Sequence, residues 1–134
     1  MKLTFVDAGV LIAAATGKPN LAKLAMQILD DAERCFSSST FVKLETLPKA
    51  IYYKREAERK FYDTFFGAVV QWAAVDEKLT GAALAEASHC GLNACDALHI
   101  AAAIGTKSAE LITTEKPTTA IHRTQSVVVK TIHP

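Results

Sequence analysis

Apolar residues follow two different periods along the chain, and the period changes from one segment to the next. Lys2–Val6 and residues 126–132 are rich in β-branched and aromatic residues, which predicts strands. Between them, spacing at i, i+3 and i+4 predicts helices. The predicted helices cover residues 10–15, 21–32, 41 onward, 55–72, 77–89 and 93–105, and the other predicted strands are 35–36, 73–75 and 111–113. Alternating strands and helices favour an α/β fold with a small parallel sheet flanked by helices.

Polar and glycine residues mark several helix ends. Asn20 and Asn93 stand where N-caps are expected, and Gly91 follows the helix over residues 77–89. Pro48 lacks a backbone N–H, so we expect it to bend or interrupt the helix that begins near residue 41. No repeat or linker divides the chain, and residues 1–134 therefore predict a single domain.

Composition narrows the functional classes. Half of the residues are hydrophobic, yet no apolar run approaches the ~18 residues that span a bilayer, and Asp7 comes too early for a signal peptide. We therefore expect a soluble, cytoplasmic protein without membrane association. Three cysteines cannot all pair, which argues against a disulfide scaffold. The net charge of +1 is too small to give the whole protein a positive potential that attracts polyanions such as nucleic acids. Any basic binding site must therefore be local.

Four acidic residues follow apolar stretches that would bury them, namely Asp7, Glu45, Asp96 and Glu115. A lone carboxylate among apolar neighbours loses hydration, so such groups often share a cation. In a parallel sheet, Asp7 and Glu115 follow strands whose carboxyl ends meet at one edge, and Glu45 and Asp96 would reach that edge from helices. Carboxylate oxygens suit Mg²⁺ or Mn²⁺. The spacing thus predicts a divalent-metal site.

A basic segment, residues 49–60, holds five of the fifteen Lys and Arg residues and two tyrosines. Lys54, Arg55, Arg59 and Lys60 could hold the backbone of a nucleic acid without reading its sequence. The more common alternative is a solvated helix end in which Glu56 and Glu58 pair with the cations.

Four motifs in order resemble the PIN-domain family, which includes the VapC-type toxins of toxin–antitoxin pairs. The motifs are Phe5-Val6-Asp7, Phe41-Val42-Lys43-Leu44-Glu45, Cys95-Asp96-Ala97-Leu98-His99 and Leu111-Ile112-Thr113-Thr114-Glu115. The resemblance implies a three-layer PIN-like fold and a Mg²⁺- or Mn²⁺-dependent ribonuclease. It assigns metal binding and catalysis to the four acids. It also implies that the hydroxyl of Thr113 contacts the substrate. It also implies RNA as substrate, an antitoxin protein as partner and a homodimer.

The sequence departs from this pattern at three positions. Ala8 and Gly9 stand where the family usually carries Ser or Thr and then Asn, and Glu115 stands where it usually carries Asp. Without polar groups beside a metal site, the metal ligands are oriented less firmly. A PIN-like binding or scaffolding module with weakened catalysis is therefore the alternative function, and restoring residues 8, 9 and 115 should raise the cleavage rate.

Two further alternatives are less favoured. A phosphoacceptor receiver domain is also α/β, but it would carry paired acids after the first strand, and these are absent. Cys95 and His99 could share a zinc ion, but the usual Cys-x-x-Cys pairing is missing. We expect His99 to make a hydrogen bond in the core, and Phe61, Phe65 and Trp72 to form core or a dimer face.

Overall fold

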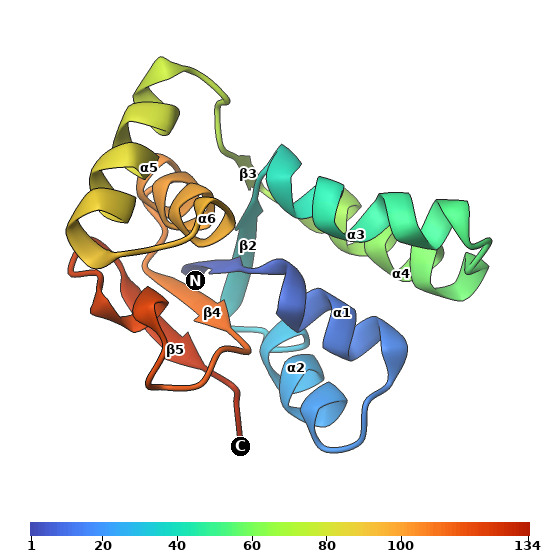
Figure 1. Cartoon of the computed structure of the whole chain (residues 1–134). Coiled ribbons are helices and arrows are strands. Elements are labelled where there is room, and N and C mark those ends of the chain that lie inside the picture. The colour runs from blue at the N-terminus through green and yellow to red at the C-terminus, as the bar shows by residue number, and fades with distance from the viewer.

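A five-stranded sheet, in which every pair of neighbouring strands is parallel, organises the chain (Figure 1). The structure is a computed structural model that describes residues 1–134. The strands are β1 (Lys2–Val6), β2 (Arg34–Ser38), β3 (Gln71–Trp72), β4 (Glu110–Thr113) and β5 (Val128–Thr131). Their order across the sheet is β3-β2-β1-β4-β5. The sheet therefore has β1 at its centre, although β1 is the first strand of the chain.

Helices cover both faces of the sheet, with α5 and α6 on one side and α1 to α4 on the other (Figure 1). The helices are α1 (Ala8–Thr16), α2 (Leu21–Leu29), α3 (Thr40–Tyr52), α4 (Glu56–Ala68), α5 (Glu77–Cys90) and α6 (Ala94–Gly105), with a short 3₁₀ helix, η1 (Ala120–Arg123). This three-layer arrangement confirms the predicted α/β fold with a parallel sheet. None of these helices is long and apolar enough to cross a membrane.

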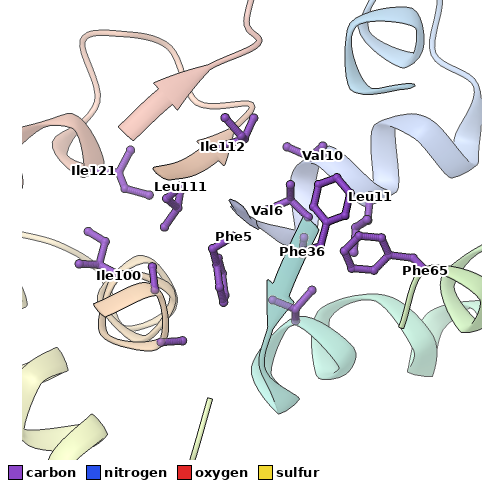
Figure 2. Packing of buried hydrophobic residues seen from close by; sticks show 14 of the residues in the cluster. Phe5, Val6, Val10, Leu11, Phe36, Phe65, Ile100, Leu111, Ile112 and Ile121 are labelled. Atoms are coloured by element: carbon purple, nitrogen blue, oxygen red, sulfur yellow. The ribbon is translucent and has the colours of Figure 1, made fainter. Parts of the chain in front are cut away.

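The core lies on both sides of β1 and β4, whose apolar side chains are shielded from solvent. Phe5 and Leu111 are fully buried. The ring of Phe5 packs against His99 of α6, with 5.9 Å between the ring centroids, and Phe36 of β2 packs against Phe65 of α4 on the other face. Figure 2 shows these apolar side chains between the sheet and the helices. The central strands are thus held rigidly, and so are the residues that follow them.

Most local signals in the sequence predict the helix ends correctly. Asn93 accepts a hydrogen bond from the backbone N–H of Asp96 at the start of α6, and Gly91 ends α5 in the left-handed conformation with φ of 71°. Asp7 caps α1, which begins two residues earlier than predicted. The predicted cap at Asn20 is wrong, because its side chain makes no capping hydrogen bond. The chain reaches α2 there with a φ of 66° at Asn20.

The structure departs from the sequence-based predictions at Pro48 and at the end of α4. Helix α3 continues through Pro48 to Tyr52, so of the predicted bend or interruption the interruption does not occur. Helix α4 ends at Ala68, and the strand after it is Gln71–Trp72 rather than residues 73–75. Backbone hydrogen bonds from Val70 to Phe36 and from Ala73 to Ser38 draw this segment onto the edge of β2. The edge of the sheet thus sets where β3 forms.

Neighbouring strands β1 and β4 are also where the chain changes direction across the sheet. From β1 the chain moves to β2 and β3 on one side, and it later returns to β4 and β5 on the other. At such a switch point the connections diverge and leave a crevice beyond the carboxyl ends of the strands. The backbone N–H of Asp7 donates to the carbonyl of Ile112 at 3.0 Å, which ties the end of β1 to β4 at this edge.

Candidate active site at the carboxyl edge of the sheet

A hollow of about 210 Å³ opens at the carboxyl ends of β1 and β4. All four acids singled out in the sequence line it, and they come from four separate segments. Its lining residues are Asp7, Ala8, Gly9, Ile12, Glu45, Asp96, His99, Thr114 and Glu115. The fold therefore gathers carboxylates that are up to 108 positions apart in the sequence (from 7 to 115) into one place.

Asp7 is the most enclosed of the four acids, with 7% of its surface exposed. It follows β1 and caps α1, where its Oδ1 atom accepts a hydrogen bond from the backbone N–H of Val10 at 3.2 Å. Burial raises the pKa of Asp7 to about 6, although the Thr113 hydroxyl and the charge of His99 act in the opposite direction. Asp7 therefore carries its negative charge at neutral pH against a substantial desolvation cost.

Asp96 is half-buried in the first turn of α6. The side chain of Asn93 accepts a hydrogen bond from its backbone N–H at 2.8 Å and fixes the start of the helix. Burial raises the pKa of Asp96, and the negative charge of Glu115 raises it further. Burial is thus the main cause at both Asp7 and Asp96, and repulsion between the carboxylates at the hollow adds to it.

Glu45 reaches the hollow from α3 and is held there by a histidine of α6. Its Oε1 atom lies 2.5 Å from His99 Nε2. His99 is buried, as expected for a core histidine, but it also lines the hollow. One side-chain contact thus joins α3 to α6. Sequence reasoning missed this pairing, because residues 45 and 99 have no local relation.

Glu115 lies beyond the end of β4, and its backbone is fixed by two hydroxyl groups. Its N–H donates to Thr113 Oγ1 at 3.1 Å, and Thr131 Oγ1 donates to its carbonyl at 2.6 Å. Both Glu115 and Glu45 are exposed, so the expectation that all four acids are buried is wrong for these two. Thr113 is fully buried and does not line the hollow. Its hydroxyl instead holds the backbone of Glu115 in the loop that follows β4.

The basic residues predicted to hold a substrate do not line the hollow. Lys54, Arg55 and Arg59 lie at the tip of the hairpin formed by α3 and α4, which projects away from the sheet (Figure 1). Arg59 pairs with Glu56 at 2.8 Å and with Asp63 at 3.0 Å, and Arg55 lies 3.8 Å from Glu58. Both arginines therefore have carboxylate partners on α4, as the alternative interpretation expected.

The donor set at the hollow fits a hard divalent cation by its chemistry. It consists of carboxylates, and burial and mutual repulsion raise the pKa values of Asp7 and Asp96. A bound cation would compensate both of these costs of the negative charges. As the side chains lie, no three His, Cys, Asp or Glu residues surround one point as ligands. Glu45 contacts His99 through Oε1 only, so its second oxygen, Oε2, makes no hydrogen bond within the protein. Nothing here favours zinc, because Cys95 is exposed and His99 faces Glu45.

Gly9 has a role that sequence reasoning missed. Its backbone is helical, so it does not need glycine for conformational freedom. However, a Cβ atom at position 9 would lie 2.4 Å from Thr114 Oγ1 and 3.3 Å from Asp7 Oδ1. The Thr114 hydroxyl therefore occupies the space that a side chain at residue 9 would need. Restoring Asn at position 9, as the departures suggested, would collide with Thr114.

Comparison with known proteins identifies the family. The model of the PIN domain matches residues 4–117. The chain belongs to the PIN-domain family. This confirms the resemblance drawn from the four sequence motifs. Membership supports a nuclease role, and PIN nucleases generally use divalent metal ions. No curated protein sequence is detectably similar to the chain.

Solved structures with the same fold come from several bacteria. A toxin–antitoxin complex from Klebsiella pneumoniae has a TM-score of 0.71 at 20% identity, covering 93% of this chain and 95% of the other. VapBC2 from Rickettsia felis, bound to a DNA fragment from its promoter, has a TM-score of 0.69 at 14% identity and covers 96% and 98%. FitAcB from Neisseria gonorrhoeae has a TM-score of 0.64 at 15% identity and covers 94% and 95%. At these identities the likeness shows a shared fold over nearly the whole PIN chain.

Proposed function

We propose that this PIN protein is a ribonuclease that depends on Mg²⁺ or Mn²⁺, with Asp7, Glu45, Asp96 and Glu115 as its metal-binding and catalytic residues. The observation that carries the proposal is the convergence of these four acids, from four segments, on one hollow at the switch point of the sheet. The family supports a nuclease role, and carboxylates are the donors that hard cations prefer. RNA is the substrate class that the sequence motifs imply.

Each side chain has a task that follows from its surroundings. Asp7 sits on the rigid end of β1 and would bind the cation with the carboxylate that burial has stripped of water. Asp96 lines the same hollow from the first turn of α6, and the contact with His99 would hold Glu45 at the hollow. When bound, the cation would lower the pKa of a water molecule and stabilise the charge on the phosphodiester. No protein nucleophile is needed.

We further propose that the protein is the toxin of a toxin–antitoxin pair. Three of the solved structures with this fold are complexes described as toxin–antitoxin or VapBC assemblies. The chain also exposes large apolar side chains on α3 and after it, including Ile51 with 56% and Tyr52 with 78% of their surfaces exposed. A protein partner, either an antitoxin or a second copy, would shield them. Light scattering on the chain alone would test for the homodimer.

A second candidate is a PIN module that binds RNA or protein but cleaves weakly. Two observations favour it: Ala8 and Gly9 offer no polar side chain beside Asp7, and no three acids surround a single point in the structure. This candidate and the ribonuclease differ in one measurable respect. The weakened module would bind RNA or protein with little metal-dependent turnover, whereas the ribonuclease would show clear turnover.

The test is a calorimetric titration with Mn²⁺, followed by turnover of an unstructured RNA. Wild type should bind Mn²⁺, and Asp96→Asn should lose that binding because one negative ligand is removed. Asp63→Asn is the matched control, since Asp63 is exposed on α4 and pairs only with Arg59. Equal Mn²⁺ binding by wild type and Asp96→Asn would overturn the metal site. If wild type binds Mn²⁺ but cleaves RNA no faster than the Asp96→Asn background, the non-catalytic module is favoured.

A further inference from the structure

Thr114 presents an unpaired hydroxyl to the acidic hollow. The hydroxyl groups of Thr113 and Thr131 make hydrogen bonds to the backbone of Glu115, whereas no group of the protein bonds to the hydroxyl of Thr114. Thr114 is half-buried and lines the hollow together with Asp7 and Asp96. The hydroxyl is therefore available to a ligand at the place where the carboxylates meet.

The position of this hydroxyl matches a gap on the other side of the hollow. Ala8 and Gly9 follow Asp7 without any side-chain oxygen or nitrogen. A Cβ atom built on Gly9 would lie 2.4 Å from Thr114 Oγ1 and 3.3 Å from Asp7 Oδ1, so Thr114 Oγ1 and Asp7 Oδ1 flank the same spot. A polar side chain on residue 9 would enter this space, and Thr114 fills it from the loop that follows β4.

We propose that Thr114 is a positioning residue of the metal site, whose hydroxyl takes the place of the polar side chains that residues 8 and 9 lack. Its Oγ1 atom would hold the water or the carboxylate around the cation from the β4 side. Gly9 is then the complement of Thr114, because only a residue without a side chain leaves room for that hydroxyl. The inference rests on the proposed metal-dependent function and names a residue outside the four acids.

The alternative is that Thr114 only fills space, and substitutions of matched shape separate the two. Thr114→Val keeps the volume and removes the hydroxyl, while Thr114→Ser keeps the hydroxyl. If the hydroxyl matters, Thr114→Val should bind Mn²⁺ about tenfold more weakly, the usual scale for losing a group that orients metal ligands. Thr114→Ser should bind nearly as well as wild type. Thr118→Val is the control, since Thr118 is exposed in the loop that follows Glu115.

A second experiment moves the hydroxyl across the hollow. Gly9→Ser alone should lower the melting temperature in EDTA, because its Cβ collides with Thr114 Oγ1. In the Thr114→Ala background the colliding atom is gone, and the remaining neighbours of a Cβ at residue 9 lie 3.3 Å and 3.5 Å away. The double variant Gly9→Ser with Thr114→Ala should therefore fold better than Gly9→Ser. It should also recover most of the Mn²⁺ affinity that Thr114→Ala loses.

The outcomes distinguish this inference from the proposed function. If Thr114→Val binds Mn²⁺ as tightly as wild type while Asp96→Asn does not bind, Thr114 is merely a space-filling residue and the metal site stands without it. If wild type itself binds no Mn²⁺, the proposed function fails and this inference fails with it. A Gly9→Ser variant as stable as wild type would refute the steric pairing in its own right.

Discussion

Glu110 should be one of the largest single contributors to the stability of this PIN protein. It begins β4 with a side chain that is 1% exposed, and four partners meet its carboxylate, the most distant being Lys2 Nζ at 3.6 Å. Thr4 Oγ1 donates to it at 2.6 Å, Arg34 Nε at 2.8 Å and Lys130 Nζ lies at 3.0 Å. Burial by itself would raise the pKa of Glu110, but these partners outweigh it and lower the pKa from 4.5 to about 2.

That pKa difference sets the size and the pH range of the effect. The folded state holds the charged form more strongly than the unfolded chain does, by about 3 kcal/mol at neutral pH. The contribution is complete above pH 4.5, the ordinary value, and is lost as the pH falls toward 2. Glu110→Gln keeps the shape but leaves Arg34 without its buried partner. We therefore expect it to lower the free energy of unfolding by about 3 kcal/mol at pH 7.

Urea denaturation at a series of pH values measures this directly. The gap between wild type and Glu110→Gln should be widest at pH 7 and should shrink between pH 4.5 and pH 3. Glu33→Gln, an exposed acid beside Arg34, is the control and should stay close to wild type. A gap below about 0.5 kcal/mol at pH 7, or one that does not change with pH, would refute the reasoning. Mn²⁺ binding should be intact in Glu110→Gln, because Glu110 lies at the opposite edge of the sheet.

Two other predictions concern the site and the basic hairpin. Because burial raises the pKa of Asp7 to about 6, its charged form destabilises the metal-free fold above that pH. Asp7→Asn should thus gain about 1–3 kcal/mol of stability at pH 7.5 in EDTA while losing Mn²⁺ binding, and thermal unfolding without that gain would contradict the burial argument. At the hairpin tip, Lys54 and Lys60 make no ion pair, so Lys54→Glu with Lys60→Glu should weaken binding of unstructured RNA. It should also reduce the slope of the logarithm of the RNA-binding constant against the logarithm of salt concentration by about 0.7 for each lysine. An unchanged slope would mean that the hairpin is a solvated surface that does not contact RNA.

Local sequence patterns predicted those features of the fold that depend on neighbours along the chain. Asn93 and Gly91 mark their helix ends correctly because a cap is made within one turn. The apolar strands 2–6 and 111–113 were predicted from composition alone, and their parallel pairing follows from the helices between them. The meeting of four acids at one edge was an expectation from the same topology. The structure brings them together, and their roles stay a prediction.

Features that depend on pairing across the chain were not predicted. Glu110 is the most enclosed acid, yet nothing in Ala-Glu-Leu-Ile distinguishes it from Glu115, because its partners Thr4 and Arg34 come from other strands. The contact of Glu45 with His99 and the fit of Thr114 over Gly9 join distant segments in the same way. A substitution proposed from the family pattern alone, Asn at position 9, ignores this packing.

The central place of β1 has a consequence for the order in which the candidate site is assembled. Asp7 is made first, but its strand acquires its second neighbour only when β4 pairs with it, with Thr4 beside Glu110. Glu115 follows β4, so the hollow is complete only after most of the chain has been synthesised. A growing chain therefore carries an unfinished site, and one side of the apolar strand β1 stays open meanwhile. For the ribonuclease proposed above, this order would delay activity until the polypeptide is nearly finished.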